Sequence, residues 1–228
     1  MRTYSALAFR KRLSRAAQRE AFGRDVPDNK MHLTFSGLSG IITVNRKRRY
    51  GDRGGVRNSM NQTYIIREAV PDDAEKMIAY LNQVGGESDH LLHGENEFLV
   101  PVEGVKRKLA MSQESENSIV LIALENEQII ARAELEGYYA ARIRHKAKFS
   151  ISVRKAYWNQ GIGTEMINRI AEQAKKMKIH MIELEVITDN AGAIALYHKT
   201  GFTDIGIYRD FFYVNGMYKD AIIMQKKV

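Results

Sequence analysis

The stretch Phe149-Ser-Ile-Ser-Val153, Arg154-Lys-Ala-Tyr-Trp-Asn-Gln160, Gly161-Ile-Gly163-Thr164 indicates a short strand, a tight turn and the start of a helix. Glycines at 161 and 163 let a ligand approach the backbone closely. The first turn of the helix carries N–H groups without intrahelical partners and the positive end of the helix dipole. We therefore expect this stretch to bind a phosphate or pyrophosphate, as part of a nucleotide-containing cofactor.

Two common phosphate-binding motifs are excluded at this turn. A dinucleotide fingerprint needs a third glycine at position 166, where this chain has Met166. A P-loop needs Gly-Lys followed by Ser or Thr, and the turn has no such sequence. The alternative interpretation is a turn that is rich in glycine only for packing.

The composition is that of an ordinary globular protein of 228 residues, enough for one domain with an appendage or for two small domains. The chain has no cysteine, which excludes disulfides, thiolate metal sites and a cysteine nucleophile. It has no run of 18 apolar residues, so we expect no membrane partner and a cytoplasmic location.

The net charge of +8 is unevenly distributed along the chain. Residues 1–60 hold 14 Lys and Arg against 4 Asp and Glu, whereas residues 61–228 hold 21 against 23. The nearly neutral later part gives no sign of a nucleic-acid partner. We therefore treat residues 1–59 as a separate basic segment and residues 60–228 as the folded domain.

Three interpretations of residues 1–59 are open. The segment could be a basic arm that binds nucleic acid or an anionic surface, or an arginine-rich transit peptide. We favour the third interpretation, in which the segment is disordered or extraneous to the domain.

From residue 63 the sequence predicts the element order β-α-α-β-β-β-α-β-α-β-β. The predicted strands are 63–68, 118–123, 128–138, 149–153, 180–187, 205–214 and 217–224. The strand–helix–strand unit at 149–187 implies a right-handed crossover and a parallel pair, and Asn215-Gly216 predicts a hairpin turn. Gly85-Gly86 is expected to stop the first helix. The fold class is therefore α/β (α+β), with a mixed, mostly antiparallel central sheet, a parallel strand pair and flanking helices.

Two motifs in this order carry a family resemblance. The first is Trp158-Asn-Gln-Gly-Ile-Gly163, similar to Arg/Gln-x-x-Gly-x-Gly/Ala but with Trp158 at the position that is usually Arg or Gln. The second is Asn190-Ala-Gly-Ala-Ile-Ala-Leu-Tyr197-His-Lys-Thr-Gly201-Phe202, similar to Asn-x-x-Ala-x-x-x-Tyr-x-x-x-Gly-Phe. Over about residues 63–228 the chain thus resembles the GNAT superfamily of acetyl-CoA-dependent N-acetyltransferases.

The resemblance implies a site for acetyl-CoA as co-substrate and no metal. The parallel strands 149–153 and 180–187 would splay apart and admit the pantetheine arm. Backbone N–H groups of residues 159–164 would hold the pyrophosphate, and one near Ile151 would polarise the thioester carbonyl. The implied cofactor-binding residues are Ile151, Val153, Trp158, Asn159, Gln160, Gly161, Ile162, Gly163, Thr164, Asn190 and Tyr197.

Two of these residues have both a catalytic and a structural interpretation. The resemblance implies that Asn190 touches the pantetheine and that Tyr197 protonates the departing thiolate. Asn190 is also a good helix N-cap, and Tyr197 could be a core aromatic. Both alternatives remain open.

The general base is not fixed by the sequence. We take Glu134 and Glu136 as the catalytic candidates beside Tyr197; Glu183, Glu185, His145 and a water chain are the alternatives. The cluster His90, His93, Glu95 and Glu97 fits no closed zinc pattern, so a polar loop is expected there.

The expected activity is acetyl transfer from acetyl-CoA to a primary amine, of a small molecule or of a protein N-terminus or lysine, in a ternary complex. Glu87 and Asp89 suggest that the acceptor loop attracts a cation. The alternative is an acyl-CoA-binding regulatory or nucleic-acid-associated module without turnover. A monomer or a homodimer would fit either.

Overall fold

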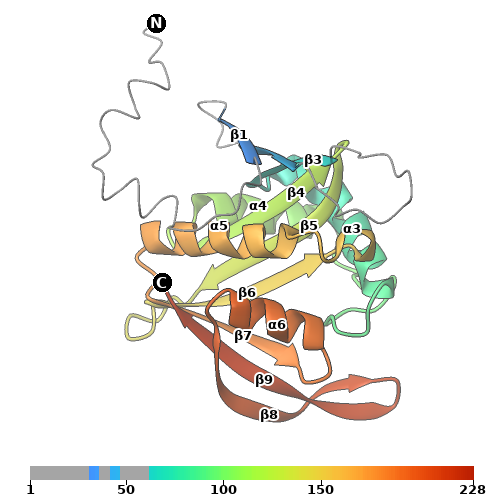
Figure 1. The fold of residues 1–228 in the computed structure, drawn as a ribbon, viewed down its shortest axis with the longest axis vertical. Coiled ribbons are helices and arrows are strands. Elements are labelled where there is room, and N and C mark those ends of the chain that lie inside the picture. Colours follow the sequence, from blue (N-terminus) through green and yellow to red (C-terminus); the bar gives the residue numbers. More distant parts are fainter. Residues whose placement is uncertain (1–30, 36–41, 47–61) are drawn as a thin grey trace, which may run out of the picture. The chain divides into compact units, whose positions relative to one another are not determined.

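The computed structural model describes residues 31–35, 42–46 and 62–228 of the chain (Figure 1). Residues 63–228 belong to one compact unit. Two short strands, β1 (Met31–Phe35) and β2 (Ile42–Arg46), lie in the segment for which the sequence predicted no fold. The rest of residues 1–59 lies outside the described residues, so the expectation of a disordered or extraneous segment stays a prediction.

From residue 62 the element order agrees with the order that the sequence predicts. The strands are β3 (Gln62–Glu68), β4 (Ser118–Glu125), β5 (Gln128–Gly137), β6 (Lys146–Val153), β7 (Met181–Ile187), β8 (Thr203–Val214) and β9 (Met217–Lys227). The α-helices are α3 (Ala74–Gly86), α4 (Val102–Glu114), α5 (Ile162–Lys176) and α6 (Ala191–Lys199). Two short 3₁₀ helices, η1 (Pro71–Asp73) and η2 (Lys155–Tyr157), precede α3 and α5.

Strands β3 to β9 form a mixed sheet in the order β3-β4-β5-β6-β7-β9-β8. Every neighbouring pair in this order is antiparallel except β6 and β7, which are parallel. The predicted fold class is thus confirmed.

The parallel pair of strands separates soon after it forms. Only Lys146 to Lys148 of β6 pair with Met181 to Glu183 of β7. Beyond these pairs β6 continues along β5 and β7 continues along β9, and Figure 1 shows the two strands diverging. The predicted splay is therefore present, and we call the opening between residues 149–153 and 184–187 the split.

Helices cover both faces of the sheet. Along β4, alternate residues enter two different apolar clusters because successive side chains of a strand point to opposite faces. Ile119, Leu121 and Ala123 join the cluster of α5 and α6, whereas Val120, Ile122 and Leu124 join that of α3 and α4. Figure 1 shows α5 and α6 in front of the sheet and α4 behind it.

The two glycines at the end of α3 serve a purpose that the sequence did not reveal. The helix ends at Gly86 as predicted, but its cap residue Glu87 is right-handed, with φ −86°, so no left-handed glycine cap stops it. A Cβ atom on Gly85 would lie 2.3 Å from the carbonyl oxygen of Gly94. The glycines therefore allow the chain that follows α3 to fold back against the helix.

Gly85→Ala should destabilise the protein, because the added methyl group meets backbone atoms that cannot rotate away. We expect the free energy of unfolding to fall by about 1–3 kcal/mol, the usual effect of overpacking. Gly192→Ala in α6 is the control, since its added Cβ would meet only Asn190 Oδ1, at 3.9 Å. Thermal unfolding of both variants tests this. Equal midpoints would show that the segment around Gly94 shifts to accommodate the methyl group at no cost in stability.

A chain that begins at Met60 should fold. Both apolar clusters of the described residues are built from Tyr64 onward. We expect cooperative thermal unfolding and circular dichroism close to those of the full chain. Insoluble or unfolded protein would show that residues 1–59 supply part of the core.

Candidate active site

The turn before α5 has two glycines with different roles. Gly161 has φ +81° and ψ 3°, a left-handed conformation that favours glycine. A Cβ on Gly163 would lie 2.8 Å from Cδ2 of Leu196, so Gly163 allows α6 to pack closely on α5. Gly161 is also the N-cap of α5 and contributes no side-chain hydrogen bond to the first-turn N–H groups. This helix start thus has the features of an anion seat.

The residues leading into this turn are held by three side chains. Trp158 donates its indole N–H to the carbonyl of Val153 at 2.6 Å, and Gln160 donates its amide to the carbonyl of Ala156 at 2.8 Å. Tyr157 donates to Glu125 at 2.5 Å. The tryptophan at the position that is usually Arg or Gln therefore ties the turn back to the end of β6.

One edge of β6 faces the split. Ile151 and Val153 pair with Ala133 and Ala131 of β5 on the other edge. Because β7 has already separated at this level, an extended ligand could pair with β6 as an added strand. The structure thus places both predicted pantetheine-contacting residues along the split.

Tyr197, on α6, packs beside the residues at which the split begins. Its ring packs edge-on against Phe149 and Phe202, with centroids 6.5 and 5.6 Å apart. Phe149 is the first residue of β6 beyond the strand pairs, so Tyr197 lies beside the point of separation. Its hydroxyl forms no hydrogen bond with the described part of the chain, and burial raises the pKa of this phenol. The ring is thus a core aromatic, and the hydroxyl stays protonated near neutral pH.

Asn190 is the N-cap of α6, as one of its two interpretations predicted. Its Oδ1 accepts a hydrogen bond from the N–H of Ala193 at 3.1 Å. Contact between this residue and a pantetheine arm stays a prediction.

Glu134 and Glu136 lie on the face of β5 that carries α3 and α4. Glu134 forms ion pairs with Arg132 and, at 2.8 Å, with Lys108. Burial would raise the pKa of Glu134, but these two positive charges outweigh burial and lower it. A lower pKa makes Glu134 a weaker proton acceptor. Glu136 is exposed and lies opposite Lys148 in the strand register.

The other candidate bases are Glu183, Glu185 and His145, and only Glu185 lies in the split. Glu183 is in the paired part of β7, where it accepts from Tyr138 at 2.6 Å and pairs with Lys146 at 2.5 Å. Glu185 lies beyond the pairs, in the split, with Lys148 at 3.4 Å. His145 precedes the paired end of β6, away from the split.

Glu87 lies in the predicted acidic loop, but its partners are on a distant segment that the sequence does not reveal. The carboxylate of Glu87 accepts the N–H of Lys155 at 2.6 Å and pairs with Nε of Arg154 at 3.3 Å. Asp89 accepts from the side chain of Asn215 at 3.0 Å. Both carboxylates thus bind groups of the chain itself, and Arg154 offsets the negative charge of Glu87 that was expected to attract a cation. No sequence pattern links partners that are 68 and 126 residues apart.

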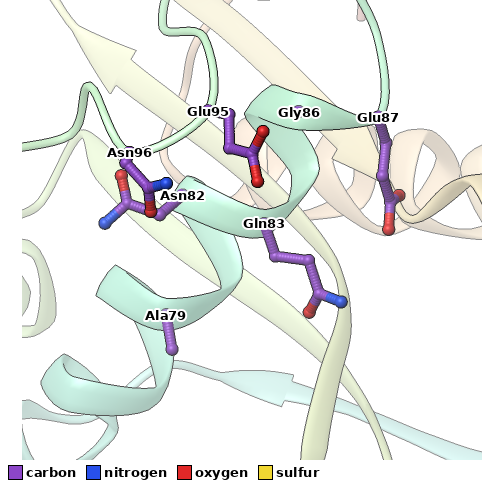
Figure 2. A pocket seen from close by; sticks show the side chains of 7 residues that line it. All are labelled: Ala79, Asn82, Gln83, Gly86, Glu87, Glu95 and Asn96. Carbon is purple, nitrogen blue, oxygen red and sulfur yellow. The ribbon is translucent and has the colours of Figure 1, made fainter.

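A hollow of about 500 Å³ lies on the outer side of α3. It is lined by Ala79, Asn82, Gln83, Gly86, Glu87, Glu95 and Asn96 (Figure 2). Figure 2 shows Glu87 at one edge, apart from Asn82 and Asn96. None of the lining residues belongs to β6, β7, α5 or α6, but Glu87 at its edge also binds Arg154 and Lys155, which directly follow β6.

In the described part of the chain, no helix is long and apolar enough to cross a bilayer. The same residues hold no group of three or more His, Cys, Asp and Glu side chains that could bind a metal ion.

Comparison with known proteins decides the family. The model of the acetyltransferase (GNAT) domain matches residues 66–223. The chain belongs to the GNAT family. A GNAT acetyltransferase from Streptococcus pneumoniae is 31% identical, with a TM-score of 0.70 over 72% of this chain and 99% of that one. The YncA protein of Salmonella typhimurium, solved with its cofactor acetyl-CoA, is 21% identical, with a TM-score of 0.63 over 71% of this chain and 92% of that one.

Curated GNAT relatives match a smaller part of the chain. The [ribosomal protein bS18]-alanine N-acetyltransferase of Escherichia coli is 36% identical over 76 residues, 33% of this chain and 51% of the relative. Spermidine N(1)-acetyltransferase of Vibrio cholerae is 30% identical over 89 residues, 37% of this chain and 51% of the relative. The chain thus spans about half the length of these curated relatives.

Proposed function

We propose that this GNAT protein transfers the acetyl group of acetyl-CoA to a primary amine by direct attack in a ternary complex. The observation that carries the proposal is the split, which lies between the N-terminus of α5 at one end and the ring of Tyr197, packed on Phe149, at the other. These are the parts needed to seat a phosphate, extend a pantetheine arm and assist a leaving thiolate.

The binding of acetyl-CoA uses the backbone more than the side chains. The N–H groups of residues 159–164, at the start of α5, receive the pyrophosphate. The pantetheine arm pairs with Ile151 and Val153 as an added strand, and Asn190 contacts it from the start of α6. A backbone N–H near Ile151 donates to the thioester oxygen as negative charge develops there.

The chemistry needs a base and an acid. The deprotonated amine attacks the thioester carbon, the C–S bond breaks, and its electron pair goes to sulfur. Tyr197 gives its proton to sulfur. The nitrogen is positively charged after its attack, and the proton that it then loses restores the phenol. Free coenzyme A and the acetylated amine are the products.

The ammonium proton leaves through the face of the sheet that carries Glu134, Glu136 and Glu185, directly or by water. Arg132 and Lys108 lower the pKa of Glu134, which makes this carboxylate poorly suited to accept the proton. The position of Glu185 in the split favours it geometrically, and Glu136 has no positive partner in the ion pairs of the described residues.

The acceptor is the amine of a small molecule or of a peptide. The relatives act, by their names, on the alanine of a ribosomal protein, on L-amino acids and on spermidine. An acceptor screen with a peptide bearing an N-terminal alanine, free L-amino acids and spermidine would identify the class. Thiol release from acetyl-CoA that depends on one of these amines supports the proposal. Tight acetyl-CoA binding without amine-dependent thiol release from a wide amine panel would instead favour a regulatory acyl-CoA-binding module.

A further inference from the structure

We propose that Glu87 is a positioning residue for the turn of residues 154–161, which we call the coenzyme A turn. Through Glu87 this turn is coupled to residues 87–101, which we call the α3–α4 loop. The inference rests on the proposed function, because its measurable consequence is the affinity for the nucleotide part of acetyl-CoA.

The first argument is that Glu87 caps a helix far away in the sequence. The 3₁₀ helix η2 begins at Lys155, and its own N-cap residue Arg154 provides no side-chain hydrogen bond. Instead, the carboxylate of Glu87 accepts the N–H of Lys155 at 2.6 Å. A carboxylate at a helix N-terminus satisfies an otherwise unpartnered donor and matches the helix dipole.

The second argument is that the same carboxylate holds two successive residues. Its Oε1 lies 3.3 Å from Nε of Arg154, while its Oε2 binds the N–H of Lys155. The side chains of Arg154 and Glu87 are only 21% and 19% exposed. Solvent therefore screens this ion pair less than a surface pair. Loss of the carboxylate would leave both donors of the turn without this partner.

The third argument is that hydrogen bonds within the turn link the position of Lys155 to that of Gly161. Trp158 bonds to the carbonyl of Val153, and Gln160 bonds to that of Ala156. Six residues after Lys155, the chain reaches Gly161, the N-cap of α5. A shift at Lys155 would thus move the amides that receive the pyrophosphate.

The fourth argument concerns the other contacts of the α3–α4 loop. Asp89 accepts from Asn215 at 3.0 Å, and His90 lies 3.3 Å from Asp189. Asp189 directly precedes Asn190, the N-cap of α6. One short loop therefore fastens to the coenzyme A turn through Glu87, to the β8–β9 hairpin and to the start of α6.

The test compares Glu87→Ala and Glu87→Gln with Glu95→Ala as the matched control. Glu95→Ala removes an exposed carboxylate from the same loop but no contact with the coenzyme A turn. Calorimetry gives the Kd for coenzyme A, and thermal unfolding without ligand reports stability. Where an acceptor amine is known, kcat/KM is measured with acetyl-CoA and with acetyl-pantetheine, which lacks the pyrophosphate and nucleotide.

We expect Glu87→Ala to raise the Kd for coenzyme A about tenfold, as for loss of a charge-assisted hydrogen bond. Glu87→Gln should recover part of this loss, because its amide oxygen can still accept from Lys155. Glu95→Ala should change the Kd less than about twofold, the small effect usual for an exposed side chain. The loss in kcat/KM for Glu87→Ala should be larger with acetyl-CoA than with acetyl-pantetheine.

Three outcomes would overturn the inference. An unchanged Kd in Glu87→Ala, in a parent that binds coenzyme A, removes the positioning role and leaves the proposed function standing. Equal losses with the two donors would mean that Glu87 acts through general stability. A parent that does not bind coenzyme A would overturn the proposed function and this inference with it. Glu87→Gln keeps the test decisive if Glu87→Ala does not fold.

Discussion

Tyr197→Phe is expected to lower kcat by about 10²-fold, the lower end for loss of general acid catalysis, with little change in acetyl-CoA affinity. A thiol has a pKa of about 8.5 and a phenol of about 10, so the phenol is protonated at neutral pH. Burial raises the pKa of Tyr197 further. Phenylalanine keeps the ring contacts with Phe149 and Phe202 and removes only the donor.

The measurement should separate the chemical step from product release. Single-turnover acetyl transfer reports the chemical step directly. Tyr139→Phe is the control, because Tyr139 is 78% exposed and lies outside the cluster around Tyr197. A chemical step as fast in Tyr197→Phe as in the parent would leave Tyr197 with a purely structural role.

Gly161→Asp is expected to weaken coenzyme A binding by about 10²-fold or more, because a carboxylate would compete for the amides that hold the pyrophosphate. The aspartate lies at the N-cap of α5, where its charge repels the phosphates and also stabilises the helix. The left-handed backbone of this position disfavours most side chains, but aspartate and asparagine tolerate it best. Binding should therefore fall much more than stability.

Gly161→Asn isolates the effect of charge. It has nearly the same size and the same tolerance of a left-handed backbone, but it is neutral. Calorimetry with coenzyme A should give a Kd between those of the parent and of Gly161→Asp. The phosphate seat is misplaced if Gly161→Asp binds coenzyme A as tightly as the parent does.

Local sequence patterns were sufficient to predict most of the fold. The apolar stripe of α5, with Met166, Ile167 and Ile170, is buried as its helical spacing predicts. Asn215-Gly216 does join β8 to β9. The split also followed from the family resemblance. Each of these features is fixed by residues close together in the sequence or by a motif of fixed spacing.

Local sequence patterns do not predict contacts between segments that are distant in the sequence. The sequence predicts a helix stop at Gly85 but does not reveal the close approach of Gly94. It offers Glu134 as a candidate base but does not reveal the ion pairs with Arg132 and Lys108. It places Glu87 in the acceptor loop but does not reveal that its carboxylate caps η2. In each case the decisive neighbour lies on another element, and only the folded chain brings the two together.

The short parallel pairing of β6 with β7 means that the sheet consists of two half-sheets. Strands β3 to β6 form one and β7 to β9 the other, and three residue pairs join them. Acetyl-CoA bound in the split would form backbone hydrogen bonds with the unpaired edge of β6 and act as a temporary strand. The resting protein would then be an incomplete sheet that its own substrate completes, so its resistance to unfolding would rise with the concentration of acetyl-CoA.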